Sequence, residues 1–167
     1  MAPLLEGPPK TTRIIFFLVI QTTGVDVGKP VNITNSPADD GGPQFLADSG
    51  GVLFTSNRDG RPGALYRYDF AAKTTTPATE ADQAAYAPPS RSVGAAASLD
   101  EESEEVIVPP TRSSLMARQS KVFLRKEDDD HWMEIASFKK AGVTGIRHVA
   151  VSPDGRWIAF AAGQVVK

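Results

Sequence analysis

The chain has 167 residues, 41% of them hydrophobic and 23% charged, which is the composition of an ordinary folded domain. Its 18 basic and 20 acidic residues give a net charge of −2, a balance that argues against general binding to the phosphate backbone of nucleic acids. The absence of cysteine excludes disulfides, thiolate zinc sites and thiol catalysis, and it leaves the cellular compartment open.

The N-terminal region combines a proline-rich start with one long apolar run. We expect a flexible arm over 1–12, because these residues show no apolar pattern. The apolar run at 14–20 has seven residues, whereas a membrane helix needs about 20. Gln21 follows this run, where a signal peptide would have small residues for cleavage. We therefore predict a buried strand over 13–20, no membrane insertion and no recognisable signal peptide.

Short apolar runs alternate with turn-forming clusters along the rest of the chain. Their spacing of roughly 8–12 residues is typical of all-β sandwiches, barrels and propellers. Only 80–85 and, weakly, 114–120 permit a helix. The predicted strands are 13–20, 30–34, 43–47, 51–57, 64–70, 73–78, 121–125, 131–137, 146–152 and 156–162.

Two stretches, 43–56 and 149–162, align without a gap as copies of one β-hairpin. An aspartate suits the turn because its carboxylate accepts backbone N–H bonds, and a glycine there supplies positive φ. The apolar residues that follow the turn alternate, so they share one face of a strand. The aligned pairs are Asp48 with Asp154, Val52 with Ile158, and Phe54 with Phe160.

The first copy continues into a second turn at 56–60, a third strand at 64–70 and a fourth at 73–79. Four antiparallel strands in about 40 residues have the size of one propeller blade. The residues that we assign to the turns of both copies are Asp48, Gly50, Asp59, Gly60, Asp154 and Gly155.

These motifs resemble the repeat of TolB-type β-propellers over about 30–79 and 143–162. The resemblance implies four-stranded antiparallel blades, a bacterial origin and a periplasmic or secreted location. At 46–50 the first copy departs from the usual Ser-Pro-Asp-Gly turn of the family. The matching segments are VNITNSP at 31–37, FTSNRDG at 54–60, LYRYD at 65–69 and VSPDGRWIAF at 151–160.

The repeat signature disappears in an irregular insert near 83–120, inside a single propeller-like domain over 13–167. This insert is a degenerate blade with doubtful strands over 84–109, a long loop, or the remains of missing blades. Its acidic run at 100–105 is typical of a solvated loop, although it could also attract a basic partner.

Strand counting suggests how the domain closes. The two N-terminal strands lack inner partners, and the last two strands, over 146–162, lack outer partners, so we predict that the two sets form one sheet. The total is about three blades, fewer than the four to eight of closed rings. We therefore expect an open three-blade arc, or a homodimer that completes a six-bladed ring.

Three polar motifs are candidate binding sites. Asp128-Asp-Asp-His131 could hold a metal, but neighbouring residues of a strand point in opposite directions, and a hairpin turn is favoured. The segment 56–60 lacks the ligand pattern of an EF-hand and is interpreted as a turn. His148 shares a strand face with Ile146; it is either a ligand-facing group near a propeller channel or, in the favoured interpretation, a hydrogen-bonded surface histidine.

Five aromatic residues could form a sugar or peptide platform, although cross-strand packing is the favoured use. These are Tyr66, Tyr68, Tyr86, Trp132 and Trp157.

The sequence predicts a non-enzymatic module for protein–protein interaction. It has no G-x-S-x-G nucleophile motif and no glycine-rich phosphate loop, and we predict no catalytic, cofactor-binding or metal-binding residue. The alternatives are an accessory propeller of a prolyl-oligopeptidase-like peptidase, a small-ligand-binding propeller, and a truncated remnant without function.

Overall fold

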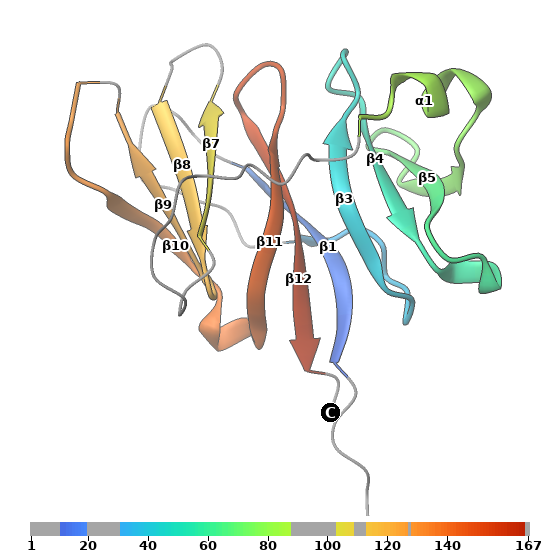
Figure 1. Ribbon diagram of the computed structural model, residues 1–167, viewed down its shortest axis with the longest axis horizontal. Coiled ribbons are helices and arrows are strands. Elements are labelled where there is room, and N and C mark those ends of the chain that lie inside the picture. Colours follow the sequence, from blue (N-terminus) through green and yellow to red (C-terminus); the bar gives the residue numbers. More distant parts are fainter. Residues whose placement is uncertain (1–10, 20–30, 88–102, 109–112, 127, 166–167) are drawn as a thin grey trace, which may run out of the picture.

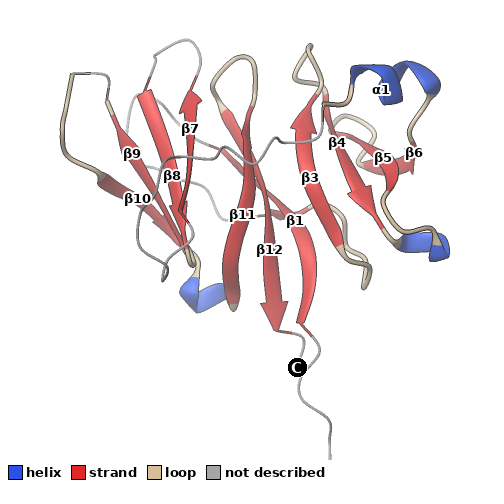
Figure 2. Cartoon of the chain, in the orientation of Figure 1, coloured by secondary structure: helices blue, strands red, loops and turns tan. Residues whose placement is uncertain are grey.

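Strands build most of the described protein, and helices are few and short (Figure 2). The computed structural model describes residues 11–19, 31–87, 103–108, 113–126 and 128–165. Within them, twelve strands form three four-stranded antiparallel sheets, here called A, B and C. The predicted all-β fold class is therefore confirmed.

Sheet A contains, in spatial order, β11 (Val143–Val151), β12 (Trp157–Val165), β1 (Thr11–Val19) and β2 (Val31–Asn32). Sheet B contains β3 (Asp40–Phe45), β4 (Gly51–Ser56), β5 (Ala64–Asp69) and β6 (Thr74–Pro77). Sheet C contains β7 (Ser103–Val108), β8 (Ser113–Arg118), β9 (Lys121–Arg125) and β10 (Met133–Ser137). The helical segments are the 3-10 turns η1 (Arg58–Gly60) and η2 (Lys139–Ala141) and the helix α1 (Glu80–Ala85).

Sheet B is the four-stranded unit predicted over 43–79. Its strands pair in chain order, so each connection is a short turn between antiparallel neighbours. Hydrogen bonds close the turns around 46–51 and 56–64, where aspartate and glycine tolerate the tight reversal.

Sheet A joins the two ends of the described chain, as the strand count predicts. β12 pairs with β1 along all nine residues of β1. β2 is shorter than predicted and pairs with β1 only through Asn32 and Val31. Residues 1–10 of the predicted flexible arm lie outside the described residues, whereas Thr11 and Thr12 belong to β1.

Sheet C corrects the interpretation of 84–120. Residues 114–120, which weakly permit a helix by sequence, mostly form the strand β8 instead. Leu115, Met116 and Ala117 are good helix formers, but pairing with β7 and β9, together with burial of Leu115 and Ala117 against sheet A, favours a strand. Of the two doubtful strands over 84–109, one corresponds to β7, which lies inside this range, whereas β8 lies beyond it and α1 occupies its first two residues. Residues 88–102, including part of the acidic run, lie outside the described residues.

Sheet A lies between the other two sheets, with sheet C on the left and sheet B on the right in Figure 1. Strand β12 faces both neighbours. Its side chains alternate, so Ile158 and Phe160 enter the core shared with sheet C, while Ala159 and Ala161 enter the core shared with sheet B. All four are almost completely buried.

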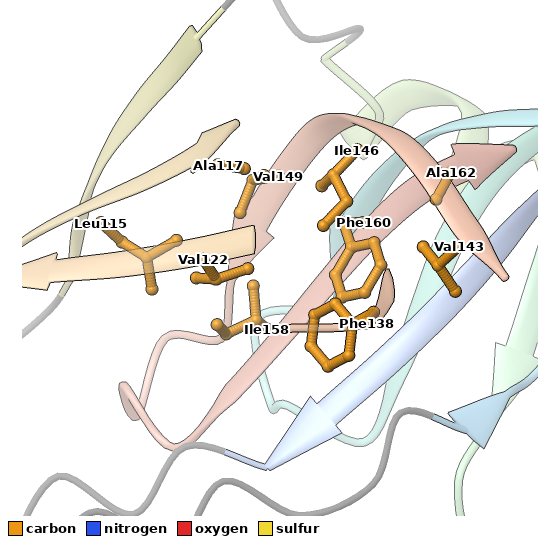
Figure 3. Close-up of a cluster of buried hydrophobic side chains, with 10 residues drawn as sticks. All are labelled: Leu115, Ala117, Val122, Phe138, Val143, Ile146, Val149, Ile158, Phe160 and Ala162. Carbon is orange, nitrogen blue, oxygen red and sulfur yellow. The ribbon is translucent and has the colours of Figure 1, made fainter. Parts of the chain in front are cut away.

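The core between sheets A and C is drawn in Figure 3. The ring of Phe160 stacks on that of Phe138, with centroids 5.5 Å apart. In the other core, Phe54 stacks on Tyr66 of the adjacent strand, with centroids 6.1 Å apart. Phe54 and Phe160, paired by the sequence repeat, are thus both fully buried on the second strand of a sheet.

The same rule of packing governs both sheet contacts. We call the side of each sheet that bears Phe54 (B), Phe160 (A) or Met116 (C) its aromatic face. Each of these residues stands opposite an aromatic residue of the third strand in the register: Tyr66, Phe16 and Phe123. The reverse side is the opposite face, and it bears Leu53 and Thr55 in sheet B, Ala159 and Ala161 in sheet A, and Leu115 and Ala117 in sheet C.

The aromatic face of sheet B packs on the opposite face of sheet A, and the aromatic face of sheet A packs on the opposite face of sheet C. Two faces are not used in these contacts: the opposite face of sheet B and the aromatic face of sheet C.

Among the described residues, no helix has the length and apolar character required to cross a membrane.

The two repeated phenylalanines should contribute similarly to stability. Phe54→Ala and Phe160→Ala should each lower the free energy of unfolding by about 3–5 kcal/mol, because each removes a fully buried ring. Met133→Ala, at a site that is 44% exposed, should change it by less than about 0.5 kcal/mol. Urea unfolding followed by circular dichroism measures all three, and a tolerated alanine at either phenylalanine would contradict the common role.

Candidate functional site

The aspartate turns of the two hairpins have the same hydrogen bonds. In the first, Leu46 N donates to Gly51 O and Ser49 N donates to Leu46 O. Gly50 N also donates to the Asp48 carboxylate, at 2.8 Å. The bonds at the aligned positions of the second turn are Ser152 N to Trp157 O, Gly155 N to Ser152 O, and Arg156 N to Asp154 Oδ1.

Positive φ also recurs at one aligned position, occupied by Ser49 (φ 58°) and Gly155 (φ 70°), and not at Gly50. The Ser152 hydroxyl and Arg156 both donate hydrogen bonds to Asp154. These bonds lower the pKa of its carboxyl group, and the bond from Ser152 contributes most. These aspartates therefore form structural turns.

The edge strands β3 of sheet B and β11 of sheet A share a β-bulge as well. The register shifts between Gly41 and Gln44 in sheet B and between Arg147 and Ala150 in sheet A, which are aligned positions of the repeat. Each bulge contains a residue with left-handed backbone conformation. That residue is Gly42 (φ 57°) in sheet B and His148 (φ 52°) in sheet A.

His148 combines this strained backbone with a buried ring nitrogen. Its Nδ1 atom has no hydrogen-bond partner, so the expected hydrogen-bonded surface histidine is wrong for this nitrogen. Nδ1 lies 3.9 Å from the point where a Cβ on Gly41 would stand, so the ring reaches strand β3 of sheet B. Among the described residues, the other buried side-chain atom without a partner is Oδ2 of Asp40, next to Gly41.

Replacing His148 by glycine should stabilise the protein. A non-glycine residue in left-handed conformation costs roughly 1–2 kcal/mol, and the unpaired Nδ1 adds to this cost. After allowance for the greater chain entropy of glycine, His148→Gly should raise the free energy of unfolding by about 1 kcal/mol. Urea unfolding of wild type and variant measures the change, with Arg147→Gly at an exposed neighbouring position as the control. A loss of stability in His148→Gly would show that the imidazole makes a compensating contact.

The turn at 56–60 is fastened by an ion pair. Asp40 has a completely buried side chain and accepts a bond from Arg58, at 3.3 Å. The Arg58 guanidinium also donates to the Ser56 hydroxyl and lies over the rings of Phe54 and Tyr66. These contacts support the interpretation of the segment as a structural turn.

Asp59 and Gly60 complete this turn, both with positive φ. The Tyr66 hydroxyl donates to Asp59 Oδ2 at 2.8 Å, and this bond raises the pKa of the tyrosine.

The acidic motif at 128–131 also behaves as a turn, between β9 and β10. The exposed Asp129 accepts a bond from the backbone N–H of the exposed His131, at 2.9 Å, and this bond contributes most to lowering the pKa of Asp129. Within the part of the chain that the structure describes, no three His, Asp or Glu side chains are grouped to hold a metal ion.

Helix α1 covers the opposite face of sheet B. Gln44, Leu53 and Arg67 are cross-strand neighbours on this face. Gln44 exchanges hydrogen bonds with the backbone of 85–87, and Arg67 forms an ion pair with Asp82 at 3.5 Å. Leu53, between Gln44 and Arg67 in the register, is only 1% exposed. The docking of this segment on the sheet was not predicted, although 80–85 permits a helix by sequence.

A capping box fixes the start of α1. Asp82 accepts bonds from the backbone N–H and the hydroxyl of Thr79, and the Thr79 hydroxyl accepts a bond from Asp82 N. The backbone bond from Thr79 is the largest of the contributions that lower the pKa of Asp82; the Thr79 hydroxyl and Arg67 act in the same direction.

The helix should therefore loosen in acid. A carboxylate with a lowered pKa stabilises its folded surroundings at neutral pH, and this contribution is lost as the pH falls through the lowered pKa. Protection of the Gln83 and Tyr86 amides from hydrogen exchange, which reports α1 formation, should fall in acid relative to that of sheet amides. Asp82→Asn should show the lower protection already at neutral pH, whereas Glu80→Gln should behave as wild type. Equal protection in Asp82→Asn and wild type at neutral pH would contradict this role.

A cleft of about 760 Å³ lies between the η1 turn, the ends of β5 and β6, and α1. Tyr66 and Tyr86 both line it, and their hydroxyls are tied to Asp59 and Gly42. The further lining residues include Arg61, Leu65, Pro77 and Gln83.

The five aromatic residues considered as an alternative binding platform are not gathered in this cleft, which only Tyr66 and Tyr86 of them line. Tyr66 packs across strands on Phe54, as the favoured interpretation predicts, and Trp157 stacks on Phe70. Trp132 lies elsewhere, under the guanidinium of Arg125.

The aromatic face of sheet C differs from those of sheets A and B because none of the described sheets packs on it. Met116 and Phe123 occupy the positions of Phe54 and Tyr66 but remain partly exposed and belong to neither core. Arg125 lies over Trp132 with 4.8 Å from its Cζ to the ring centroid. This surface was not predicted, because Met116 falls in the irregular insert near 83–120, where the sequence shows no clear strand pattern.

One cross-strand ion pair, Lys121 with Glu134 at 2.7 Å, lies beside this surface. Its side chains are about half exposed, so it contributes little to stability.

Comparisons of the chain with protein-family models, with curated proteins and with solved structures gave no match.

Proposed function

We propose that the three sheets are blades of an open β-propeller arc of the TolB type, and that the protein is a non-catalytic module for protein–protein interaction. The repeated aspartate turn, the repeated bulge and the common rule of face packing support the relation between the blades. The TolB-type resemblance adds a periplasmic or secreted location to the proposal.

The aromatic face of sheet C carries this proposal. The equivalent faces of sheets A and B are each covered by a neighbouring sheet, which buries Phe160 and Phe54 completely. Sheet C instead leaves Met116, Phe123 and the Arg125–Trp132 pair partly exposed. Methionine, aromatic residues and arginine are enriched in protein interfaces and in their energetic centres.

The contacts between the sheets suggest what kind of surface the partner offers. Where sheet A packs on sheet C and where sheet B packs on sheet A, an aromatic face is covered by a sheet face with aliphatic or small residues. These are Leu115 and Ala117 in the first contact and Ala159 and Ala161 in the second. We therefore propose a protein partner that offers such a sheet face to Met116 and Phe123.

Site-specific cross-linking tests this surface. Benzoylphenylalanine in place of Phe123 in the full chain should give one discrete protein adduct on irradiation in an extract of the source cells. Met116→Glu should abolish that adduct, because it places a charge in the contact. Benzoylphenylalanine in place of the exposed Thr74 on β6 is the control. The same adducts from both positions, or an adduct insensitive to Met116→Glu, would contradict the proposal.

Small-ligand binding is the second candidate function, and the cleft beside α1 favours it. Its volume lies within the range of ligand sites, roughly 300–1,000 Å³. The two tyrosine rings are fixed by their hydroxyl bonds, and Asp59, Arg61 and Gln83 supply polar groups.

A further inference from the structure

The two faces that are not used between sheets A, B and C form a matched pair. The aromatic face of sheet C has the Met116–Phe123 pair where sheet B has Phe54–Tyr66. The opposite face of sheet B has Leu53 and Thr55 at the positions that cover an aromatic face in the other sheets. One copy of the chain therefore carries both halves of a third contact of the same kind, at its two ends.

We propose that these faces are the two halves of a head-to-tail interface between two copies of this chain, and that α1 is an intramolecular cap that blocks it. The inference rests on the proposed function, since it names a second copy as the partner for the aromatic face of sheet C. Two copies of three sheets would close a ring of six, within the four to eight blades of known propellers.

The contacts of α1 suit a removable cap. The helix has six residues, too few to be stable by itself, and its only buried residue is Asp82. It is held by polar contacts: the capping box, the Arg67–Asp82 ion pair, the bonds of Gln44 and the Tyr86–Gly42 bond. Because α1 buries little apolar surface of its own, a sheet face with Met116 and Phe123 would replace it with a gain in apolar burial.

The geometry places the cap where the next sheet would stand. Leu53 and Arg67 lie side by side on the opposite face of sheet B; Leu53 is buried, and Asp82 of α1 pairs with Arg67. Sheet B lies on one side of sheet A and sheet C on the other, so the two halves of the interface face away from each other within one copy (Figure 1). A single chain thus cannot close this contact by itself without separating its sheets.

Releasing the cap tests the proposal. Asp82→Ala removes the capping box and the ion pair, and light scattering should show its mass double from monomer to dimer. Glu80→Ala, an exposed change in the same helix turn, should remain monomeric, as should wild type at neutral pH. Adding Met116→Glu to Asp82→Ala should restore the monomer, because the charge falls in the new interface.

Three results would overturn the proposal: a monomeric Asp82→Ala with an unchanged β-type circular dichroism spectrum, a dimer insensitive to Met116→Glu, or a continuous series of larger masses. If Asp82→Ala does not fold, Tyr86→Phe and Gln44→Ala loosen α1 without touching the capping box. Each should then raise the dimer fraction above wild type, and no rise in either overturns the proposal.

The cross-linking experiment separates the two levels. A monomeric Asp82→Ala together with a discrete adduct at position 123 to a different protein rejects only the self-assembly. The absence of both the dimer and the adduct rejects the proposed interaction surface as well.

Discussion

The alternation of side chains along β12 is the constraint on which the rest of the structure depends. Ile158 and Phe160 enter one core and Ala159 and Ala161 the other, so a single strand is buried on both faces. A strand so placed requires a sheet on each side, and β1 must cover its free edge. Pairing of β1 with β12 along its whole length does this, and it makes the first described strand part of the central sheet.

When three sheets stack with an aromatic face on an opposite face each time, one face of each outer sheet stays unused. Sheet faces with apolar residues are costly to leave in water, and the two outer sheets, B and C, differ in how this face is covered. At sheet B, Leu53 is buried, and α1 is held on the same face by polar contacts with Gln44 and Arg67. At sheet C, Met116 and Phe123 stay partly exposed. This difference is the physical basis of the proposed function.

The repeat also shows where the chain departs from ideal local structure. The bulges of β3 and β11 each contain a left-handed residue. In β3 this residue is Gly42, which adopts the conformation without strain. At the aligned position His148 accepts both the strain and a buried nitrogen without a partner. Strained residues of this kind persist only where the surrounding packing holds them, here between β11 of sheet A and β3 of sheet B.

The sequence by itself determined the strands with regular alternation and the paired hairpins at Asp48 and Asp154, because these follow from local periodicity and turn chemistry. It also predicted the joining of the two chain ends, because the repeat leaves an incomplete set of strands at each end. Only the tertiary structure decided that Leu115–Ala117 form a strand, since strand pairing and the burial of Leu115 and Ala117 against sheet A outweigh the helix propensity of this segment. It also decided that α1 lies on sheet B, that His148 occupies a bulge and that Met116 lies on an open face. Each of these depends on contacts between residues far apart in the chain, which local patterns do not encode.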